Sequence, residues 1–232
     1  MDELINSPYV LSAVKISNLL KGISSSKMLY ELFEYCLDGF DFDAARSRYF
    51  LKGERGEEGR FLLPPDARTV IALGFYLLYS IDTKAVDFMS VLGNYFYADD
   101  VNSAYGNFAV EFLKPFKDNV LASVRLMIEG EREMPVAKVT KSDKKVLADA
   151  DARAIEALLD QSKGVILQYR IEPKLKAELV VLYDNFKQAI FDGDANRVKI
   201  AFIGYKYAVL FHKRSEVGIE KIEKILSEAG II

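Results

Sequence analysis

Histidine and cysteine are the side chains that most often bind metals or take part in nucleophilic catalysis, and this chain contains one of each. His212 is followed by Lys213 and Arg214 near the expected end of a helix, where positive charge is favourable. Cys36 lies in an apolar helical pattern, which is typical of a buried thiol. Clusters of cysteine or histidine are therefore excluded within one chain, and we assign no catalytic, metal-binding or cofactor-binding residue.

Pairs of aspartates could hold Mg²⁺ or Ca²⁺ through oxygen ligands alone. None of these pairs continues into a calcium loop, which has glycine at its sixth position and glutamate at its twelfth. Each pair stands where a helix is expected to begin, and aspartate is a favoured N-cap because its carboxylate accepts bonds from the free amides there. We therefore interpret the following residues as helix caps: Asp41 and Asp43, Asp99 and Asp100, Asp149 and Asp151, and Asp192 and Asp194.

Three glycines at a spacing of three, Gly53, Gly56 and Gly59, suggest comparison with loops that bind phosphate. A P-loop closes with Gly-Lys-Ser/Thr, and a dinucleotide loop has the pattern Gly-x-Gly-x-x-Gly between a strand and a helix. Neither pattern is present, and the glutamates between these glycines would repel phosphate. Short aromatic runs flank the segment, so residues 49–63 are expected to form a glycine-rich loop or a small hairpin.

The segment from 195 to 214 offers the best candidates for nucleic-acid contact, namely Lys199, Lys206, Lys213 and Arg214. Aromatic residues lie between them, and basic groups combined with stacking rings suit single strands. The same helix is apolar around most of its circumference, which is typical of a buried helix. The isoelectric point of about 5.4 also opposes general attraction to phosphate, so nucleic-acid binding is an alternative and not the first hypothesis.

Aromatic residues are concentrated in the first part of the chain, where 20 of the 28 precede residue 131. This is more than a core of short helices readily conceals, and apolar surface left outside tends to be used at interfaces. Tyrosine suits a half-wet interface because its ring is apolar and its hydroxyl is polar. Tyr95, Tyr97 and Tyr105 are therefore the candidate interface residues.

Apolar residues recur at spacings of three and four in most of the chain, which predicts an all-α, bundle-like fold. Tyr9, Ala13, Ile16 and Leu20 share one helix face. Asp66 to Ile81 is apolar on all sides, so it is expected to be the core helix of the first part.

The chain contains several signals for where helices begin. Asp82 and Thr83 are expected to cap the helix that follows the core helix, and Asp100 the helix after that. Pro115 should cause a kink or a fresh helix start because it lacks a backbone donor.

The composition changes near residues 130–147, where a polar and basic stretch interrupts the apolar pattern. We therefore expect an aromatic-rich helical subdomain over 1–130, a basic connector over 131–147 and a C-terminal helical subdomain over 148–232. Short turns between the helices favour antiparallel neighbours.

The chain has 232 residues, a hydrophobic share of 50% and a net charge of −3, which is ordinary for a globular protein. Its acidic start differs from the basic start of a secretory signal, and its longest apolar stretch is too short to span a bilayer. A single cysteine fits the reducing cytosol. We therefore expect a cytoplasmic protein without a membrane partner.

The first functional hypothesis is a protein–protein interaction or scaffolding module without catalytic activity, either homo-oligomeric or bound to another protein. It rests on the lack of a convergent catalytic set and on the surplus of aromatic residues. One alternative is a nucleic-acid-binding or regulatory protein that uses the basic connector and the 199–214 helix. Another is a small-ligand binder or enzyme with a site built from carboxylates and tyrosines.

Overall fold

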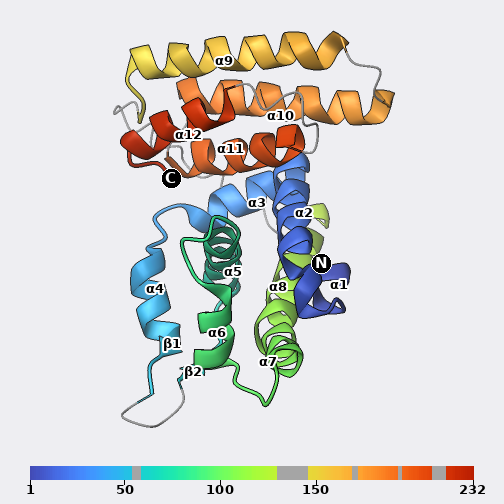
Figure 1. The fold of residues 1–232 in the computed structure, drawn as a ribbon, viewed down its shortest axis with the longest axis vertical. Helices are drawn as coiled ribbons and strands as arrows, with labels where there is room; N and C mark the ends of the chain where they lie inside the picture. Colours follow the sequence, from blue (N-terminus) through green and yellow to red (C-terminus); the bar gives the residue numbers. More distant parts are fainter. Residues whose placement is uncertain (54–58, 130–145, 169–171, 193–194, 211–217) are drawn as a thin grey trace. The chain divides into compact units, whose positions relative to one another are not determined.

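The computed structural model describes residues 1–53, 59–129, 146–168, 172–192, 195–210 and 218–232, which are helical apart from turns and one short hairpin (Figure 1). The all-α class predicted from the sequence is confirmed. The two strands are β1 (Phe50–Leu51) and β2 (Arg60–Phe61). In chain order the helices are α1 (Asp2–Ile5), the 3-10 helix η1 (Tyr9–Leu11), α2 (Ser12–Ser25), α3 (Lys27–Leu37), α4 (Phe42–Tyr49), α5 (Ala67–Asp82), α6 (Phe88–Tyr95), α7 (Val101–Phe108), the π-helix η2 (Ala109–Leu113), α8 (Lys114–Ile128), α9 (Asp149–Gln168), α10 (Pro173–Asp192), α11 (Ala195–Leu210) and α12 (Ile219–Glu228).

The chain divides into two compact units. The first comprises residues 1–20 and 35–134, and the second comprises residues 21–34 and 135–232. Helices α2 and α3 therefore contribute residues to both units. The prediction from the sequence placed both helices in one subdomain over 1–130. Residues 131–145 of the expected connector lie outside the described residues, so the division at 131–147 stays a prediction.

Helix α5 forms the centre of the first unit, as its apolar sequence predicts. The Asp66 carboxylate accepts a bond from the Thr69 amide at 2.8 Å and caps the helix. Buried residues follow on every side of the helix, with Gly74 in its middle. A Cβ atom on Gly74 would lie 2.4 Å from a ring carbon of Phe116, which is itself buried in α8. Only glycine allows the α5 backbone to approach this ring so closely.

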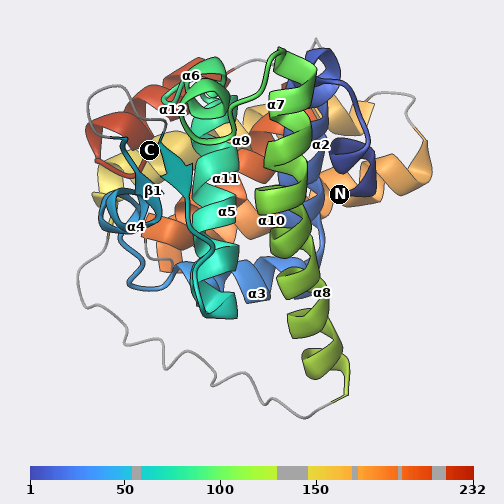
Figure 2. The same cartoon turned by 90° about the horizontal axis from the view of Figure 1, so that it is seen from below.

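Helices α7, η2 and α8 follow one another as a continuous rod beside α5 (Figure 2). The Asp100 carboxylate caps α7, as predicted. Helix α8 begins at Lys114, directly after η2, and Pro115 is its second residue. The helix continues through Pro115 without a new cap, and the π-helix η2 just before it joins α7 to α8 by i to i+5 bonding, so the kink or fresh start expected at Pro115 stays a prediction.

The segment over 49–63 forms a hairpin, so the loop that the sequence also allowed is not what the structure contains. The two strands are antiparallel, and Phe50 lies opposite Phe61 with ring centroids 4.9 Å apart. Both rings also contact Phe112, at 6.2 and 5.2 Å between centroids. Cross-strand aromatic pairs of this kind stabilise a sheet. The hairpin tip, residues 54–58, lies outside the described residues.

The turn between α5 and α6 differs from the sequence expectation. Asp82 and Thr83 were the expected caps of α6, but the helix begins at Phe88 and is capped by Asp87. The Asp87 carboxylate accepts a bond from the Ser90 amide at 2.9 Å. Lys84 reverses the chain with a φ of 60°, a left-handed conformation that the sequence pattern does not reveal.

The second unit is built on three long helices, with α10 packed against both α9 and α11 (Figure 1). In its core, the Phe186 ring of α10 contacts Phe202 and Tyr205 of α11, with centroids 5.7 and 5.5 Å apart. All three side chains are buried, as the apolar circumference of α11 predicts.

Residues 21–34 join the second unit through close contacts with α11. The Ser24 hydroxyl donates to the Ile200 carbonyl at 3.1 Å, and the Tyr30 hydroxyl donates to the Arg197 carbonyl at 3.3 Å. A Cβ atom on Gly204 would lie 2.2 Å from the Ser24 Cβ. Each unit therefore contains one helix whose central glycine admits a neighbouring side chain against its backbone.

Replacing Gly74 by alanine tests the packing of the first unit. We expect Gly74→Ala to lower the free energy of unfolding by about 1–3 kcal/mol, because the new methyl group overlaps the buried Phe116 ring. Urea unfolding followed by circular dichroism measures the change.

Gly106→Ala is the matched control, since a Cβ there meets nothing within 4 Å and Gly106 lies inside α7. That variant should be more stable by about 0.5–1 kcal/mol. Equal effects of the two substitutions would contradict the close approach of α5 and α8.

Candidate protein-interaction surface

Apolar side chains that reach the solvent gather where η1 meets the start of α2. Val10 is 79% exposed, Leu11 47% and Val14 61%. These residues lie off the helix face that the sequence predicts to be buried, on which Ile16 is fully buried. A single exposed apolar residue is ordinary, but several within five positions form a patch of the kind used at interfaces.

A groove of about 510 Å³ runs beside this patch in the first unit. Buried apolar side chains from α2, α5, α6 and the turn after α5 contribute to its lining, among them Ile16, Ile81, Val86 and Phe88. Tyr9 contributes an aromatic wall, and its ring lies 5.6 Å from that of Phe88. The groove and the patch share Val10, so they form one surface, which we call the η1 groove; its lining is Tyr9, Val10, Ser12, Ala13, Ile16, Ile81, Asp82, Lys84, Val86, Asp87 and Phe88.

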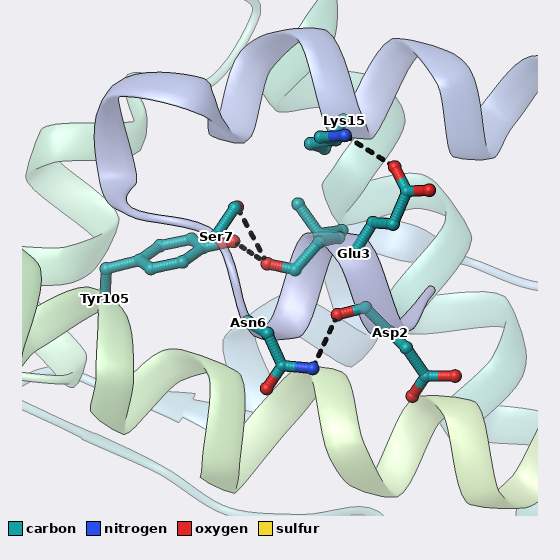
Figure 3. Close-up of polar contacts among 7 residues, drawn as sticks. Asp2, Glu3, Asn6, Ser7, Lys15 and Tyr105 are labelled. Atoms are coloured by element: carbon teal, nitrogen blue, oxygen red, sulfur yellow. Dashed lines mark hydrogen bonds and ion pairs between the residues drawn. The ribbon is translucent and has the colours of Figure 1, made fainter.

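A buried hydrogen bond fixes the segment that carries the patch. The Tyr105 hydroxyl donates to the Leu4 carbonyl at 2.6 Å, and the Ser7 hydroxyl donates to the same oxygen at 3.0 Å (Figure 3). Burial raises the pKa of the Tyr105 phenol, which keeps the donor protonated. The Leu4 side chain is itself buried, so the short helix α1 is held by apolar and polar contacts together.

Two ion pairs add to this anchoring of α1. Lys15 Nζ lies 2.5 Å from a Glu3 carboxylate oxygen (Figure 3), and Lys117 Nζ lies 2.5 Å from a carboxylate oxygen of Asp2. The hydrogen bonds from the two lysines lower the pKa of both carboxyl groups. We call these ion pairs, together with the bonds to the Leu4 carbonyl, the N-terminal anchor.

The next segment is held in the same way, because the Tyr9 amide donates to the Asn102 side-chain oxygen at 3.1 Å. Residues 1–11 thus keep their backbone fixed while Val10 and Leu11 reach the solvent. The side chains of Val10 and Leu11 are not buried, so the polar contacts hold the segment in place. A surface ordered before binding loses less entropy when a partner arrives.

The rim of the η1 groove carries charges of both signs. Lys84 is exposed at one point of the rim, and Asp82 and Asp87 are nearby. Asp82 accepts a bond from the Ser17 hydroxyl at 2.5 Å. The bonds from Ser90 lower the pKa of Asp87, which therefore stays ionised at neutral pH.

The three tyrosines predicted at an interface lie in different environments. Tyr105 is only 3% exposed, and its buried hydroxyl forms part of the N-terminal anchor. Tyr95 is half-buried against Phe50, with ring centroids 5.0 Å apart. Tyr97 is 56% exposed.

Tyr95 and Tyr97 line a second hollow of about 520 Å³ together with Lys52, Asn94 and three glycines. Residues 54–58, which connect two of these glycines, lie outside the described residues. The candidate surface is therefore built on the η1 groove, which the sequence analysis missed. The available signal was the set of apolar residues off the buried face of α2.

The basic residues proposed to contact nucleic acid do not form a described patch. Lys206 Nζ lies 2.6 Å from a carboxylate oxygen of Glu223 in α12. Lys199 is half-buried, and burial lowers the pKa of its amine. Lys213 and Arg214 lie outside the described residues. Of the two described residues in this set, Lys206 forms an ion pair and Lys199 is half-buried.

A carboxylate and a tyrosine do meet in the second unit, between α9 and α10. The Tyr183 hydroxyl donates to Asp160, and burial together with this carboxylate raises the Tyr183 pKa to about 12. Lys187 Nζ lies 2.7 Å from Glu156 and 3.6 Å from Asp160. The Lys163 Nζ atom lies 4.1 Å from the centroid of the Tyr183 ring, in a cation–π contact. A phenol with so high a pKa is a poor proton donor in catalysis. The contacts of this cluster join α9 to α10.

Searches for other kinds of site and for relatives gave negative results. Within the described ranges, no group of three or more histidine, cysteine, aspartate or glutamate side chains could hold a metal ion. None of the described helices has both the length and the hydrophobicity needed to cross a bilayer. Comparisons with models of protein families, with curated proteins and with solved structures found no match.

Removing the Tyr105 hydroxyl tests the N-terminal anchor. We expect Tyr105→Phe to lower the free energy of unfolding by about 0.5–1.5 kcal/mol, because the Leu4 carbonyl loses its buried donor. Tyr97→Phe is the control, since this tyrosine is exposed, and it should change stability by less than about 0.5 kcal/mol. Chemical unfolding measures both values, and equal losses would contradict a special role for the Tyr105 bond.

The ion pairs of the anchor predict a pH dependence. Asp2 and Glu3 titrate below their ordinary pKa values of 3.8 and 4.5, so both pairs stabilise the native state fully above those values. This contribution is lost as the pH falls through the lowered native values. Carboxyl titration by NMR checks the assignment, because Lys117→Met should raise the pKa of Asp2 and leave that of Glu3 unchanged. Lys15→Met should do the reverse, and a parallel change in both carboxyls would exclude specific pairs.

Proposed function

We propose that this chain is a protein-interaction module that binds a protein partner through the η1 groove. The observation that carries the proposal is the exposure of Val10, Leu11 and Val14 on a segment whose backbone is fixed by the N-terminal anchor. Exposed apolar side chains that lie together on an ordered surface are typical of sites that bind another protein. A cytoplasmic location, expected from the single cysteine, belongs to the same proposal.

The chemistry of the groove supports a protein partner over a small polar ligand. Apolar side chains dominate its floor, and an aromatic ring and several aliphatic groups border it. Interfaces between proteins have this composition, with an apolar centre and a charged rim, here supplied by Asp82, Lys84 and Asp87. The same acids oppose a nucleic acid, whose phosphates they would repel.

The two alternatives have weaker support. Nucleic-acid binding through residues 199–214 would require Lys206 to leave Glu223, and Lys199 is partly buried. A carboxylate and tyrosine site exists at Asp160 and Tyr183, but the phenol is held in its protonated form. Neither arrangement combines an open surface with groups ready to bind or react.

A matched pair of variants tests the proposal. Val10→Glu places a charge in the groove, and Ile128→Glu places the same charge on another exposed aliphatic residue, which is 66% exposed at the end of α8. The tagged proteins are used to recover partners from native lysate, including an added copy of the chain with a different tag. We expect at least one protein to be recovered by the wild type and by Ile128→Glu, and to be lost from Val10→Glu. Identical recovery by all three proteins would overturn the proposed function.

A further inference from the structure

We infer that η2 is a one-residue insertion, located by Pro115, that turns the buried side chains of α7 and α8 toward the same side of their common rod. The inference concerns a conformational device within the first unit and is independent of the partner proposed above. Three observations carry it: the spacing of the buried residues, the contacts that their rings make, and the position of the proline.

The buried residues of the rod are spaced one position too far apart for a regular α-helix. Phe108, Phe112, Leu113 and Phe116 are buried, and they occupy positions i, i+4, i+5 and i+8. The buried face of an α-helix repeats at i, i+3, i+4 and i+7. Removing Val110, which is 63% exposed, would convert the first pattern into the second without taking away a buried side chain.

This difference in spacing is also a difference in direction. Each residue of an α-helix turns the chain by about 100°, so Phe108 and Phe116, eight residues apart, would point about 80° from each other. The bond from the Lys114 amide to the Ala109 carbonyl spans i to i+5 and places one more residue in the turn. The eight residues then turn the chain as about seven do in an α-helix, which leaves the two rings about 20° apart.

The contacts on this side of the rod require the alignment. The Phe108 ring stacks on that of Phe112, with centroids 5.1 Å apart, and lies at the same distance from the Phe96 ring. Phe112 contacts both rings of the hairpin. Phe116 packs against the backbone of Gly74 in α5. One side of the rod therefore contacts the hairpin, α5 and the end of α6.

The same turn positions the donor of the N-terminal anchor. Tyr105 precedes Phe108 by three residues, and their ring centroids lie 6.2 Å apart. Without the extra residue, α7 would be rotated by about 100° against α8. The Tyr105 hydroxyl would then no longer face the Leu4 carbonyl to which it donates.

Pro115 determines where in the rod the extra residue lies. Its nitrogen carries no hydrogen, so it can donate neither to the Glu111 carbonyl, four residues before it, nor to the Val110 carbonyl, five residues before it. Both of these residues are exposed. A proline ring also clashes with the carbonyl four residues earlier in a regular α-helix. A wider turn therefore costs least just before Pro115.

Single-residue deletions test the inference. Pro115→Ala is made first, so that the rod can become a regular α-helix, and either Val110 or Gly106 is then deleted; both are exposed. Without Val110, the melting temperature should be at least as high as that of Pro115→Ala, because the buried residues then match an α-helix. Without Gly106, it should fall by about 10 °C or more, because Tyr105 and Ala104 turn out of the core. A Val110 deletion that fails to fold, or two deletions with equal effects, overturns the inference.

A second comparison tests the role of Pro115. With Val110 deleted and Pro115 retained, the proline lies inside a regular α-helix and clashes with the Glu111 carbonyl. Pro115→Ala should therefore raise the melting temperature more in the deletion background than in the wild type. Equal shifts in the two backgrounds would overturn the assignment of Pro115 as the residue that locates the turn.

Hydrogen exchange of residues 2–11 adds a readout for the direction of Tyr105. In the Pro115→Ala background, deletion of Val110 should leave the protection of this segment unchanged, and deletion of Gly106 should remove it. Loss of protection on deletion of Val110, with α5 still protected, would contradict the alignment. These measurements involve no partner, so their outcome is separate from that of the proposed function.

Discussion

The hydrogen bond from the Tyr105 hydroxyl to the Leu4 carbonyl is the contact on which the proposed surface depends. Helix α1 has only four residues, too few for a stable helix in water without tertiary contacts. The bond is buried, so it cannot be exchanged for one to water without moving the segment. The ion pairs of Asp2 and Glu3 reinforce it from the exposed side. Residues 9–11 therefore have a fixed starting point, and their exposed apolar side chains form a defined surface.

Close backbone packing determines the arrangement within each unit. In the first unit, Gly74 lets α5 approach the Phe116 ring of α8, and in the second, Gly204 lets α11 accept Ser24. Both glycines lie in helices with buried residues on nearly all sides, so any added atom must displace a packed neighbour. Aromatic side chains are part of both cores, among them Phe75, Phe108 and Phe186.

Local signals in the sequence were sufficient for most helices and for their starts. Asp66 and Asp100 cap helices because a single side chain next to free amides determines a helix start. The sequence did not predict the cap at Asp87. The turn before it depends on the left-handed backbone of Lys84, and lysine is not a residue type that indicates this conformation. The burial of Tyr105 and the transfer of residues 21–34 to the second unit were also missed. Both depend on contacts between residues far apart in the chain, as between Ser24 and Ile200, which periodicity does not encode. For the same reason the η1 groove, formed by η1, α2, the end of α5 with the turn after it and the start of α6, could not be predicted from the sequence.

The central claim is that residues 2–11 are fixed to the first unit while their apolar side chains remain exposed. Hydrogen exchange of the backbone amides, measured by mass spectrometry at a concentration where the chain is monomeric, tests it most directly. The amides of Leu4 and Ile5 bond to the Met1 carbonyl and that of Asn6 bonds to the Asp2 carbonyl, so all three should exchange well below the rate of an unstructured peptide. Exchange of the peptide covering residues 2–11 at the unstructured rate, with the α5 peptide fully protected, would contradict the account. It would mean that the N-terminal segment is not anchored and that no ordered groove exists before binding.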